Sequence, residues 1–295
     1  MTHKPFILGM EGVTLTQQET ELFQKHPPKG YILFKRNCHT PHQILELTAS
    51  LRQISGSDCP ILIDQEGGRV SRLKEPTFQE FPAPATFKTP DAVYQNARNM
   101  ARQLAELGIT VNCTPLADLV FDSTHAVIGD RSFGSDPHHV GLMAANVIQG
   151  HFDAHITPII KHIPGHGRAL VDSHETCPRV DTPLETLAST DFEAFIQTQS
   201  NLSPLQQENL WAMTAHIIYT DIDPLHCATQ SKIVIQDIIR KTIHFKGTLI
   251  SDCITMKALE GTMVERAQAC FEAGCDLVLH CSGDFTEMQA LLSSH

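Results

Sequence analysis

The sequence is poor in positive charge. Lysine and arginine together make up 22 of the 295 residues, against 33 aspartates and glutamates, which gives a formal net charge of −11. Proteins that bind nucleic acids or anionic membranes use clustered lysine and arginine side chains. We therefore expect no nucleic acid and no membrane as partner, and we expect a small molecule or a neutral polymer instead.

Long hydrophobic runs are missing too. A helix that crosses a bilayer needs about 18 or more consecutive apolar residues, and the sequence contains no such run. The first residues, MTHKPFILGMEG, hold one lysine and only a short apolar run before a glutamate, which is too little for the core of a signal peptide. The sequence therefore predicts a cytoplasmic protein.

Cysteine pairs and linker segments are also absent. The nine cysteines are scattered, odd in number and never spaced as Cys-x-x-Cys, so no disulfide framework is expected. Most lie in apolar segments such as VNCTPL and LVLHC, which is typical of reduced, buried thiols. Because no stretch has the composition of a linker or of low complexity, residues 1–295 are expected to form a single domain.

What the sequence does contain is a regular alternation of short apolar runs with longer segments of helical periodicity. The predicted strands are 6–10, 31–34, 61–64, 110–116, 157–162, 212–219, 248–251 and 276–281. The predicted helices are 16–26, 42–55, 91–108, 137–152, 184–198, 231–243, 263–273 and 285–293. Eight apolar strands, each followed by a helix, predict an α/β fold with a single (β/α)8 barrel of the TIM type, in preference to an open doubly wound sheet.

Polar side chains stand where the predicted strands end, which is where a (β/α)8 barrel places its chemistry. They are Asp64, Glu66, Asp118, Lys161, His162, His216 and Asp252. The segment IIKHIPGHGRALVDSHETCP (159–178) is the richest in such groups. Its histidines and Asp172 are also suitable metal ligands, so a metal-dependent barrel hydrolase is one alternative.

Three stretches together resemble glycoside hydrolase family 3, and within it the single-domain bacterial β-N-acetylhexosaminidases. They are LIDQEGGRVSRL (62–73), KHIPGHGRALVDSH (161–174) and ISDCITMKAL (250–259). VIGDRSFGSDP (127–137) and AMTAHIIYTDIDP (212–224) occupy the intervals in the order expected of the family. The likeness covers essentially the whole chain.

The resemblance implies a retaining two-step glycosidase. Asp252 matches the nucleophile, a carboxylate that attacks the anomeric carbon and forms a covalent glycosyl-enzyme. His174 matches the proton donor and later base, and Asp172 matches the aspartate that polarises it. A histidine suits this role because its ordinary pKa, about 6.5, lets it give and take a proton near neutrality.

The family match also assigns the residues that bind the sugar. A carboxylate accepts hydroxyl protons, whereas ammonium and guanidinium groups donate to hydroxyl oxygens. The assigned residues are Asp64, Arg72, Arg131, Lys161 and His162. No role is assigned to Gln65, Glu66, His166 or Arg168.

The resemblance further favours terminal β-linked N-acetylglucosamine as substrate, in peptidoglycan fragments (muropeptides), with no cofactor, no metal and a monomeric chain. One departure from the family stands beside the nucleophile, because Cys253 occupies a position where a second acid is common. The polar stretch 199–208 is longer than a usual connection and predicts a surface insertion.

Two alternatives remain open from the sequence. Against the metal-dependent hydrolase, His162 and His166 are separated by Pro164 and Gly165, so they are not a helical pair of ligands, and no HxH or HExxH pattern ends a strand. Against a non-catalytic sugar-binding relative, the residues matching the nucleophile, the proton donor and its aspartate are all present.

Overall fold

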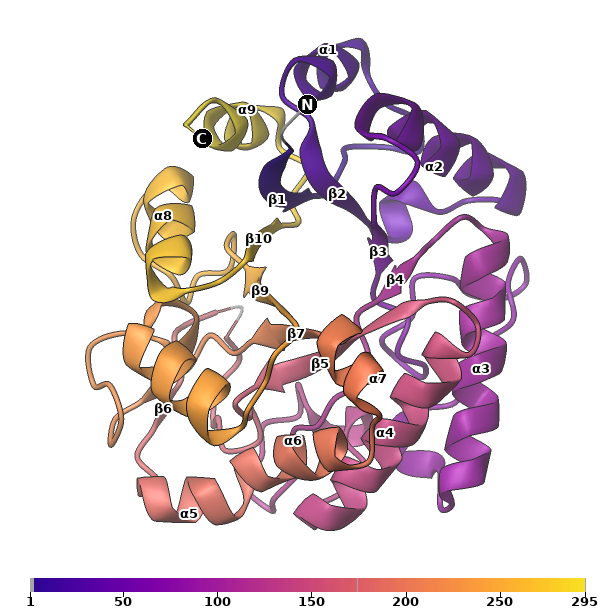
Figure 1. Cartoon of the computed structure of the whole chain (residues 1–295). Coiled ribbons are helices and arrows are strands. Elements are labelled where there is room, and N and C mark those ends of the chain that lie inside the picture. Colours follow the sequence, from indigo (N-terminus) through magenta and orange to yellow (C-terminus); the bar gives the residue numbers. More distant parts are fainter. Residues whose placement is uncertain (1–2, 174, 295) are drawn as a thin grey trace.

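The computed structural model describes residues 3–173 and 175–294. At its centre, eight parallel strands close into a barrel (Figure 1). In order around the barrel they are β1 (Lys4–Leu8), β10 (Leu277–His280), β9 (Thr248–Cys253), β7 (Trp211–Thr214), β5 (Thr157–Ile163), β4 (Val111–Asn112), β3 (Ile61–Ile63) and β2 (Pro28–Leu33). The predicted (β/α)8 barrel of the TIM type is confirmed.

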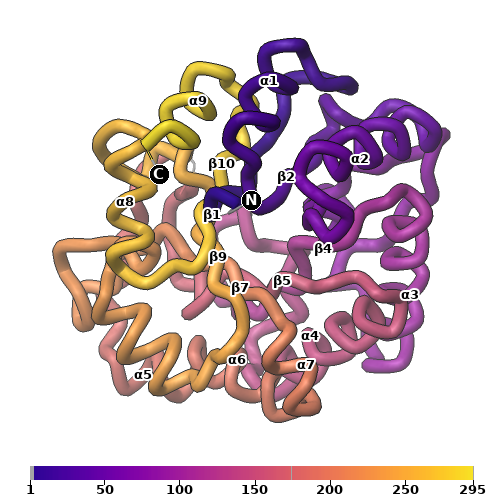
Figure 2. The backbone as a smooth tube through the Cα atoms, turned by 45° about the horizontal axis from the view of Figure 1, so that its top comes forward, coloured from indigo at the N-terminus to yellow at the C-terminus, as the bar shows by residue number. Residues whose placement is uncertain are grey.

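Helices form the outer layer of the molecule, as Figures 1 and 2 show. They are α1 (Gln17–Lys25), α2 (Pro41–Ser55), α3 (Pro90–Glu106), α4 (Pro137–Phe152), α5 (Leu184–Ser189), α6 (Asp191–Ser200), α7 (Pro204–Asn209), α8 (Met263–Ala273) and α9 (Phe285–Ser294), together with a helix over Val234–Thr242. In both views α1 and α9 lie side by side, because β1 pairs with β10 to close the ring.

Local sequence signals fix where these helices begin. Thr40, Thr89 and Asp136 accept hydrogen bonds from the first backbone N–H groups of α2, α3 and α4, and a proline follows each of them at the first helical position. Such a proline loses no helical hydrogen bond there and has its φ already set. Reciprocal capping boxes start α1 at Thr16 and α8 at Thr262.

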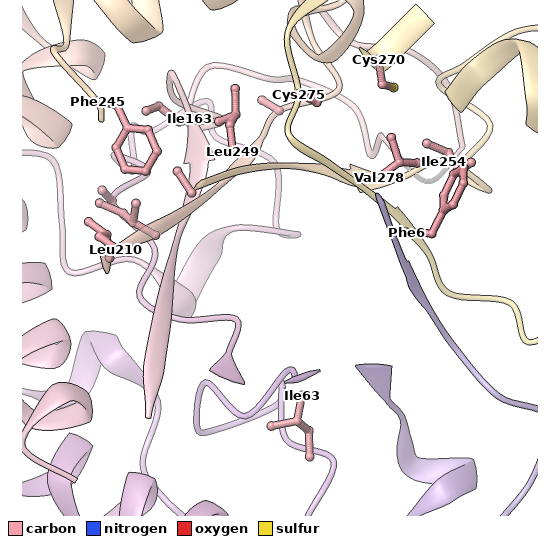
Figure 3. Close-up of a cluster of buried hydrophobic side chains, with 14 of the residues drawn as sticks. Phe6, Ile63, Ile163, Leu210, Phe245, Leu249, Ile254, Cys270, Cys275 and Val278 are labelled. Atoms are coloured by element: carbon pink, nitrogen blue, oxygen red, sulfur yellow. The ribbon is translucent and has the colours of Figure 1, made fainter. Parts of the chain in front are cut away.

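Alternation along the strands separates two apolar layers. One cluster takes residues from all eight strands, which only the inside of the barrel permits: Ile7, Ile32, Leu62, Val111, Ile159, Met213, Ile250, Leu277 and Leu279. The residues between them on the strands belong to a second cluster between the barrel and the helices. Figure 3 shows part of this outer layer, with Phe6, Ile63, Leu249 and Val278 from the strands and Phe245 and Cys270 from outside them. This period of two is the pattern of strands buried on both faces.

Four predicted segments differ in the structure. Of the strand predicted over 110–116, only Val111–Asn112 (β4) is a strand. The strand predicted over 212–219 ends at Thr214, and Ile218–Tyr219 (β8) pairs instead with Arg179–Val180 (β6) in a separate two-stranded sheet. The helix predicted over 184–198 is divided at Thr190 into α5 and α6. The predicted insertion 199–208 is largely helical, because a capping box of Ser203 and Gln206 starts α7.

The sheet formed by β6 and β8 fixes the end of the long segment after β5. The Ile218 N–H donates to Pro178 O at 2.9 Å, and the Thr220 N–H donates to Val180 O at 3.1 Å. Residues 164–178 are therefore tied to the barrel at one end by β5 and at the other by this sheet. Among the described residues, none of the helices has the length and apolar character needed to cross a membrane.

Candidate active site

A cavity of about 460 Å³ lies at the carboxyl ends of the barrel strands. Its volume falls in the range of pockets that hold small ligands, which is about 300–1,000 Å³. The residues that line it come from β5, β7, β9 and β10 and from the segments that follow β2, β3, β4, β5, β9 and β10. Six of the residues predicted for the site line this one cavity: Asp64, Arg72, Arg131, Lys161, His162 and Asp252.

Asp64, directly after β3, is held by two cations. Arg72 Nη2 donates to one carboxylate oxygen at 2.9 Å, and Lys161 Nζ donates to the other at 3.1 Å. Burial opposes the charge of the Asp64 carboxylate, but Lys161 and Arg72 outweigh it and hold its pKa below the ordinary range. Asp64 is therefore ionised at neutral pH and remains able to accept hydroxyl protons on its other lone pairs.

Glu66 contacts two of the predicted cations, Arg131 and Lys161, and so shares Lys161 with Asp64. Its carboxylate receives both Nε and Nη2 of Arg131, each at 2.8 Å, and lies 2.6 Å from Lys161 Nζ. Its side chain is 0% exposed. Burial alone would raise the pKa of Glu66, but Arg131 and Lys161 outweigh burial and lower it to about 2. Glu66 thus fixes the positions of two cations that face the cavity.

His162 is oriented by a buried aspartate. Asp118 accepts a hydrogen bond from His162 Nδ1 at 2.7 Å, and its other oxygen accepts the backbone N–H of His166 at 2.7 Å. Burial opposes the Asp118 charge, but His162 outweighs it and lowers the pKa of Asp118. The hydrogen bond from Nδ1 to Asp118 therefore sets the orientation of the His162 ring in the cavity wall and leaves Nε2 for a ligand.

The ring of His166 packs against the ring of His162. The two histidines are not arranged as ligands of one metal ion. The two ring centroids are 5.4 Å apart at an interplanar angle of 63°. Burial lowers the pKa of His166 to about 4, so its ring is neutral at pH 7, and its Nε2 lies 3.2 Å from Ser173 Oγ. In the described part of the chain, histidine, cysteine, aspartate and glutamate side chains nowhere gather in a group of three or more that could hold a metal ion.

Asp252 lies near the end of β9 and faces the same cavity. Its Oδ1 accepts the Cys253 backbone N–H at 2.7 Å, and its own N–H points at Thr214 Oγ1 from 3.4 Å. Cys253 follows it in the cavity wall, with its sulfur 3.0 Å from Thr255 Oγ1. A carboxylate on a rigid strand end has the position that a barrel enzyme gives to a reacting group.

The other two predicted catalytic residues belong to the segment after β5. Asp172 begins a turn there, because its carbonyl oxygen accepts the backbone N–H groups of Glu175 and Thr176. Its neighbour Ser173 lines the cavity. His174 lies outside the described residues.

The sequence left two of the site's buried carboxylates without a role, Glu66 and Asp118. Both follow the ends of predicted strands, 61–64 and 110–116, so their position in the sequence was a signal. Their partners could not be predicted from the sequence, because Arg131 lies 65 residues from Glu66 and His162 lies 44 residues from Asp118. Only the closed barrel brings these segments together.

Comparisons with known proteins agree with this geometry. The family model "Glycosyl hydrolase family 3 N terminal domain" matches residues 4–294. A protein named beta-hexosaminidase from Glaesserella parasuis is 36% identical over 284 residues, which are 94% of this chain and 80% of that protein. A beta-hexosaminidase from Haemophilus influenzae is 35% identical, over 94% of this chain and 79% of that protein.

Solved structures share the whole barrel. The crystal structure of NagZ from Neisseria gonorrhoeae in complex with N-trifluoroacetyl-D-glucosamine superposes with a TM-score of 0.89 at 31% identity, over 100% of this chain and 86% of that one. A glycoside hydrolase family 3 β-N-acetylglucosaminidase from Paenibacillus has a TM-score of 0.90 at 29% identity, over 98% of this chain and 56% of that one. The chain belongs to glycosyl hydrolase family 3 and is a glycoside hydrolase of the beta-hexosaminidase type.

Proposed function

We propose that the protein is a retaining exo-β-N-acetylglucosaminidase that works through a covalent glycosyl-enzyme on Asp252. The observation that carries the proposal is the position of this carboxylate. It lies on a strand end, in the wall of the cavity that also contains Asp64, Lys161 and Arg131. A nucleophile must be held rigidly beside the groups that bind the sugar, because both have to act on one ring.

The charged residues that share the cavity with Asp252 fit the binding of a terminal sugar. Asp64 accepts protons from sugar hydroxyls, while Lys161, Arg72 and Arg131 donate to hydroxyl oxygens. His162 donates or accepts through Nε2. Because their acid partners already fix these side chains, little conformational entropy is lost when a sugar binds.

The proton transfers are assigned to the segment after β5. His174 protonates the leaving oxygen in the first step and removes a proton from the attacking water in the second, with Asp172 supporting the imidazolium form. No metal or cofactor has a part in this scheme. The scheme itself depends on the match of the DSH segment to the family.

The substrate proposed is terminal β-linked N-acetylglucosamine on muropeptides. One supporting observation is that a solved relative binds N-trifluoroacetyl-D-glucosamine, a sugar with an amide at C2. We further propose that the chain acts as a monomeric, single-domain cytoplasmic enzyme. All nine of its cysteines are free, which suits a reducing compartment.

The reaction is tested with aryl β-N-acetylglucosaminide and aryl β-glucoside under the same conditions. The acetamido substrate should be hydrolysed with the higher kcat/KM, and NMR should show the β-anomer of N-acetylglucosamine as first product. An α-anomer would contradict the retaining mechanism.

A 2-fluoro sugar should label Asp252; absence of labelling together with absence of turnover would favour the non-catalytic alternative. Loss of activity with a chelator, restored by zinc, would favour the metal-dependent hydrolase.

A further inference from the structure

Two cysteines lie together in the wall of the active-site cavity. Cys253 is the last residue of β9 and follows Asp252 directly, and Cys281 comes after β10. The strands β9 and β10 are paired, with Cys253 in register with Leu279, two residues before Cys281. Both cysteines contact the apolar cluster inside the barrel. The pairing of these two strands therefore brings two thiols to one part of the cavity wall.

The cavity gives small molecules a route to these thiols. Cys253 is 7% exposed and Cys281 is half-buried. The cavity that they line has a volume of about 460 Å³, whereas a water molecule occupies about 30 Å³ of liquid. Among the described residues, these two are the only ones of the nine free cysteines that line it. A small oxidant in the cavity therefore meets this pair and no other thiol.

The two thiols differ in acidity. Hydrogen bonds from the Cys281 side chain and from Thr255, whose Oγ1 lies 3.0 Å from the Cys253 sulfur, outweigh burial and lower the pKa of Cys253. The contact with Cys253 and burial raise the pKa of Cys281. Arg36 donates through Nη2 to Cys281 O at 2.5 Å, and its guanidinium interacts electrostatically with both thiols. A hydrogen-bonded thiol beside a cation favours the thiolate, the form of cysteine that reacts with oxidants.

We propose that Cys253 and Cys281 form a peroxide-sensitive dithiol, and that its oxidation to a disulfide switches the enzyme off. The Cys253 thiolate attacks one oxygen of hydrogen peroxide, the O–O bond breaks, and the other oxygen leaves as hydroxide and takes up a proton to become water. The Cys281 sulfur then attacks the sulfenic acid on Cys253. The S–S bond forms and the sulfenic oxygen leaves with the Cys281 proton as a second water. The two thiols are oxidised by two electrons, and the peroxide is reduced to two waters.

A disulfide at this place should disturb the proposed nucleophile. Asp252 Oδ1 accepts the backbone N–H of Cys253 at 2.7 Å, so a bond that draws Cys253 toward Cys281 changes the surroundings of the carboxylate. Misplacement of a reacting group by about 1 Å can cost about 10²-fold in rate. The disulfide itself is detected by mass, without an assay of activity, so this step goes beyond the proposed function.

The test treats the reduced protein with hydrogen peroxide, blocks the remaining thiols with N-ethylmaleimide and digests the product with trypsin. Cleavage after lysine and arginine places Cys253 in the peptide 247–257 and Cys281 in the peptide 267–295. We expect these two peptides to be linked, with the bond at Cys281 and not at Cys270 or Cys275. The kcat for an aryl β-N-acetylglucosaminide should fall about 10²-fold, and dithiothreitol should restore it.

Three variants assign the effect, each compared with its own untreated activity. Cys253→Ser should give no linked peptide and should keep its activity in peroxide. Cys281→Ser should give no linked peptide either, but dimedone should trap a sulfenic acid on Cys253. The control is Cys227→Ser. Cys227 contacts Cys177 in a second pair of thiols that does not line the cavity, so this variant should form the linked peptide and lose activity as wild type does.

The remaining outcomes contradict the proposal. Absence of the linked peptide from peroxide-treated wild type, or its formation without a fall in kcat, would overturn it. So would an equal loss of activity in Cys253→Ser, which would place the sensitive group elsewhere. Circular dichroism of oxidised and reduced wild type should agree, and a lost signal would show unfolding in place of a switch. If reduced wild type does not hydrolyse the aryl substrate, the proposed function is wrong, and the linked peptide alone then decides whether the dithiol is oxidised.

Discussion

Lys161 Nζ lies 2.6 Å from a carboxylate oxygen of Glu66, and the two side chains are 3% and 0% exposed. The same carboxylate holds Arg131 through two hydrogen bonds. One buried acid therefore sets the positions of two cations in the cavity wall. Removing one partner of such a buried arrangement leaves the others with uncompensated charge.

Glu66→Gln should therefore lower both stability and activity. At pH 7 we expect the free energy of unfolding to fall by about 3 kcal/mol, the usual cost of breaking a buried ion pair. The value of kcat/KM should fall as well, because Arg131 loses its acid partner. Urea denaturation and hydrolysis of an aryl β-N-acetylglucosaminide measure the two effects. Glu208→Gln, at an exposed position, is the control and should change neither.

We also expect the loss of stability in Glu66→Gln to depend on pH. The pKa of Glu66 is lowered from its ordinary 4.5 to about 2 in the folded protein, so its stabilising effect is complete above pH 4.5. It is lost as the pH falls through 2, when the folded carboxylate takes a proton. The difference in stability between wild type and Glu66→Gln should thus shrink between pH 4.5 and pH 2. A constant difference over this range would show that Glu66 acts through packing and not through its charge.

Asp252→Asn should abolish turnover with little change in stability, because the residue faces the cavity at a strand end and not the packed layers of the barrel. A loss of about 10⁴-fold or more in kcat is the order seen when a nucleophile is removed. Steady-state kinetics and thermal unfolding measure the two quantities. Activity within tenfold of wild type would mean that another residue is the nucleophile.

His174→Ala should affect substrates according to their leaving groups. An acid or base contributes about 10²- to 10⁴-fold to rate, but a nitrophenolate needs little protonation, so its release should suffer less than that of a sugar alkoxide. The glycosyl-enzyme should then accumulate, because water is no longer activated. Intact-mass spectrometry should detect it, and azide should speed turnover of the nitrophenyl substrate. Equal losses for both leaving groups without azide rescue would remove the acid/base role from His174.

We expect His151, which does not line the cavity, to make the stability of the fold sensitive to acid. It is fully buried in α4, with Nε2 3.0 Å from Asn112 Nδ2 and Nδ1 2.9 Å from Val147 O, and burial lowers its pKa from 6.5 to about 4. In the unfolded chain His151 therefore binds a proton below about pH 6.5, whereas in the folded protein it binds one only near pH 4. Stability should be complete above pH 6.5 and fall by about 3 kcal/mol for this group as the pH drops to 4.

His151→Gln should reduce that slope without abolishing it, because burial also lowers the pKa of His166, to about 4, and the pKa of His280. Urea denaturation at several values between pH 7 and pH 4 measures it. The exposed His138 supplies the control variant His138→Gln, whose slope should match that of wild type. An unchanged slope in His151→Gln would contradict the assignment.

Periodicity predicted the barrel because the strands are buried on both faces, and several helices carry their own start signals. It did not predict where the strand over 212–219 ends. Apolar residues continue past Thr214, and only the pairing of Ile218 with Arg179, across the segment after β5, turns them into a second sheet. Pairing between distant segments leaves no local pattern, whereas the capping box that starts α7 was present in the sequence.

In the active site, too, local sequence patterns predicted some features, and only the fold determined others. Motif resemblance placed Asp64, Lys161 and Asp252 in one cavity, because those residues stand at fixed offsets from strand ends. The contact of Glu66 with Arg131 could not be predicted, because it joins segments that follow two different strands.

The pairing of β1 with β10 also bears on aggregation. A strand at the edge of an open sheet offers unpaired backbone groups to another chain, but each barrel strand here has a neighbour on both sides. Within the described residues, the free strand edges belong to β6 and β8, which pair over two residues each and are too short to serve as a template. Intermolecular β-sheet should therefore form only after β1 and β10 have separated, so the amyloid-type hazard of this chain lies in partly unfolded forms and not in the native one.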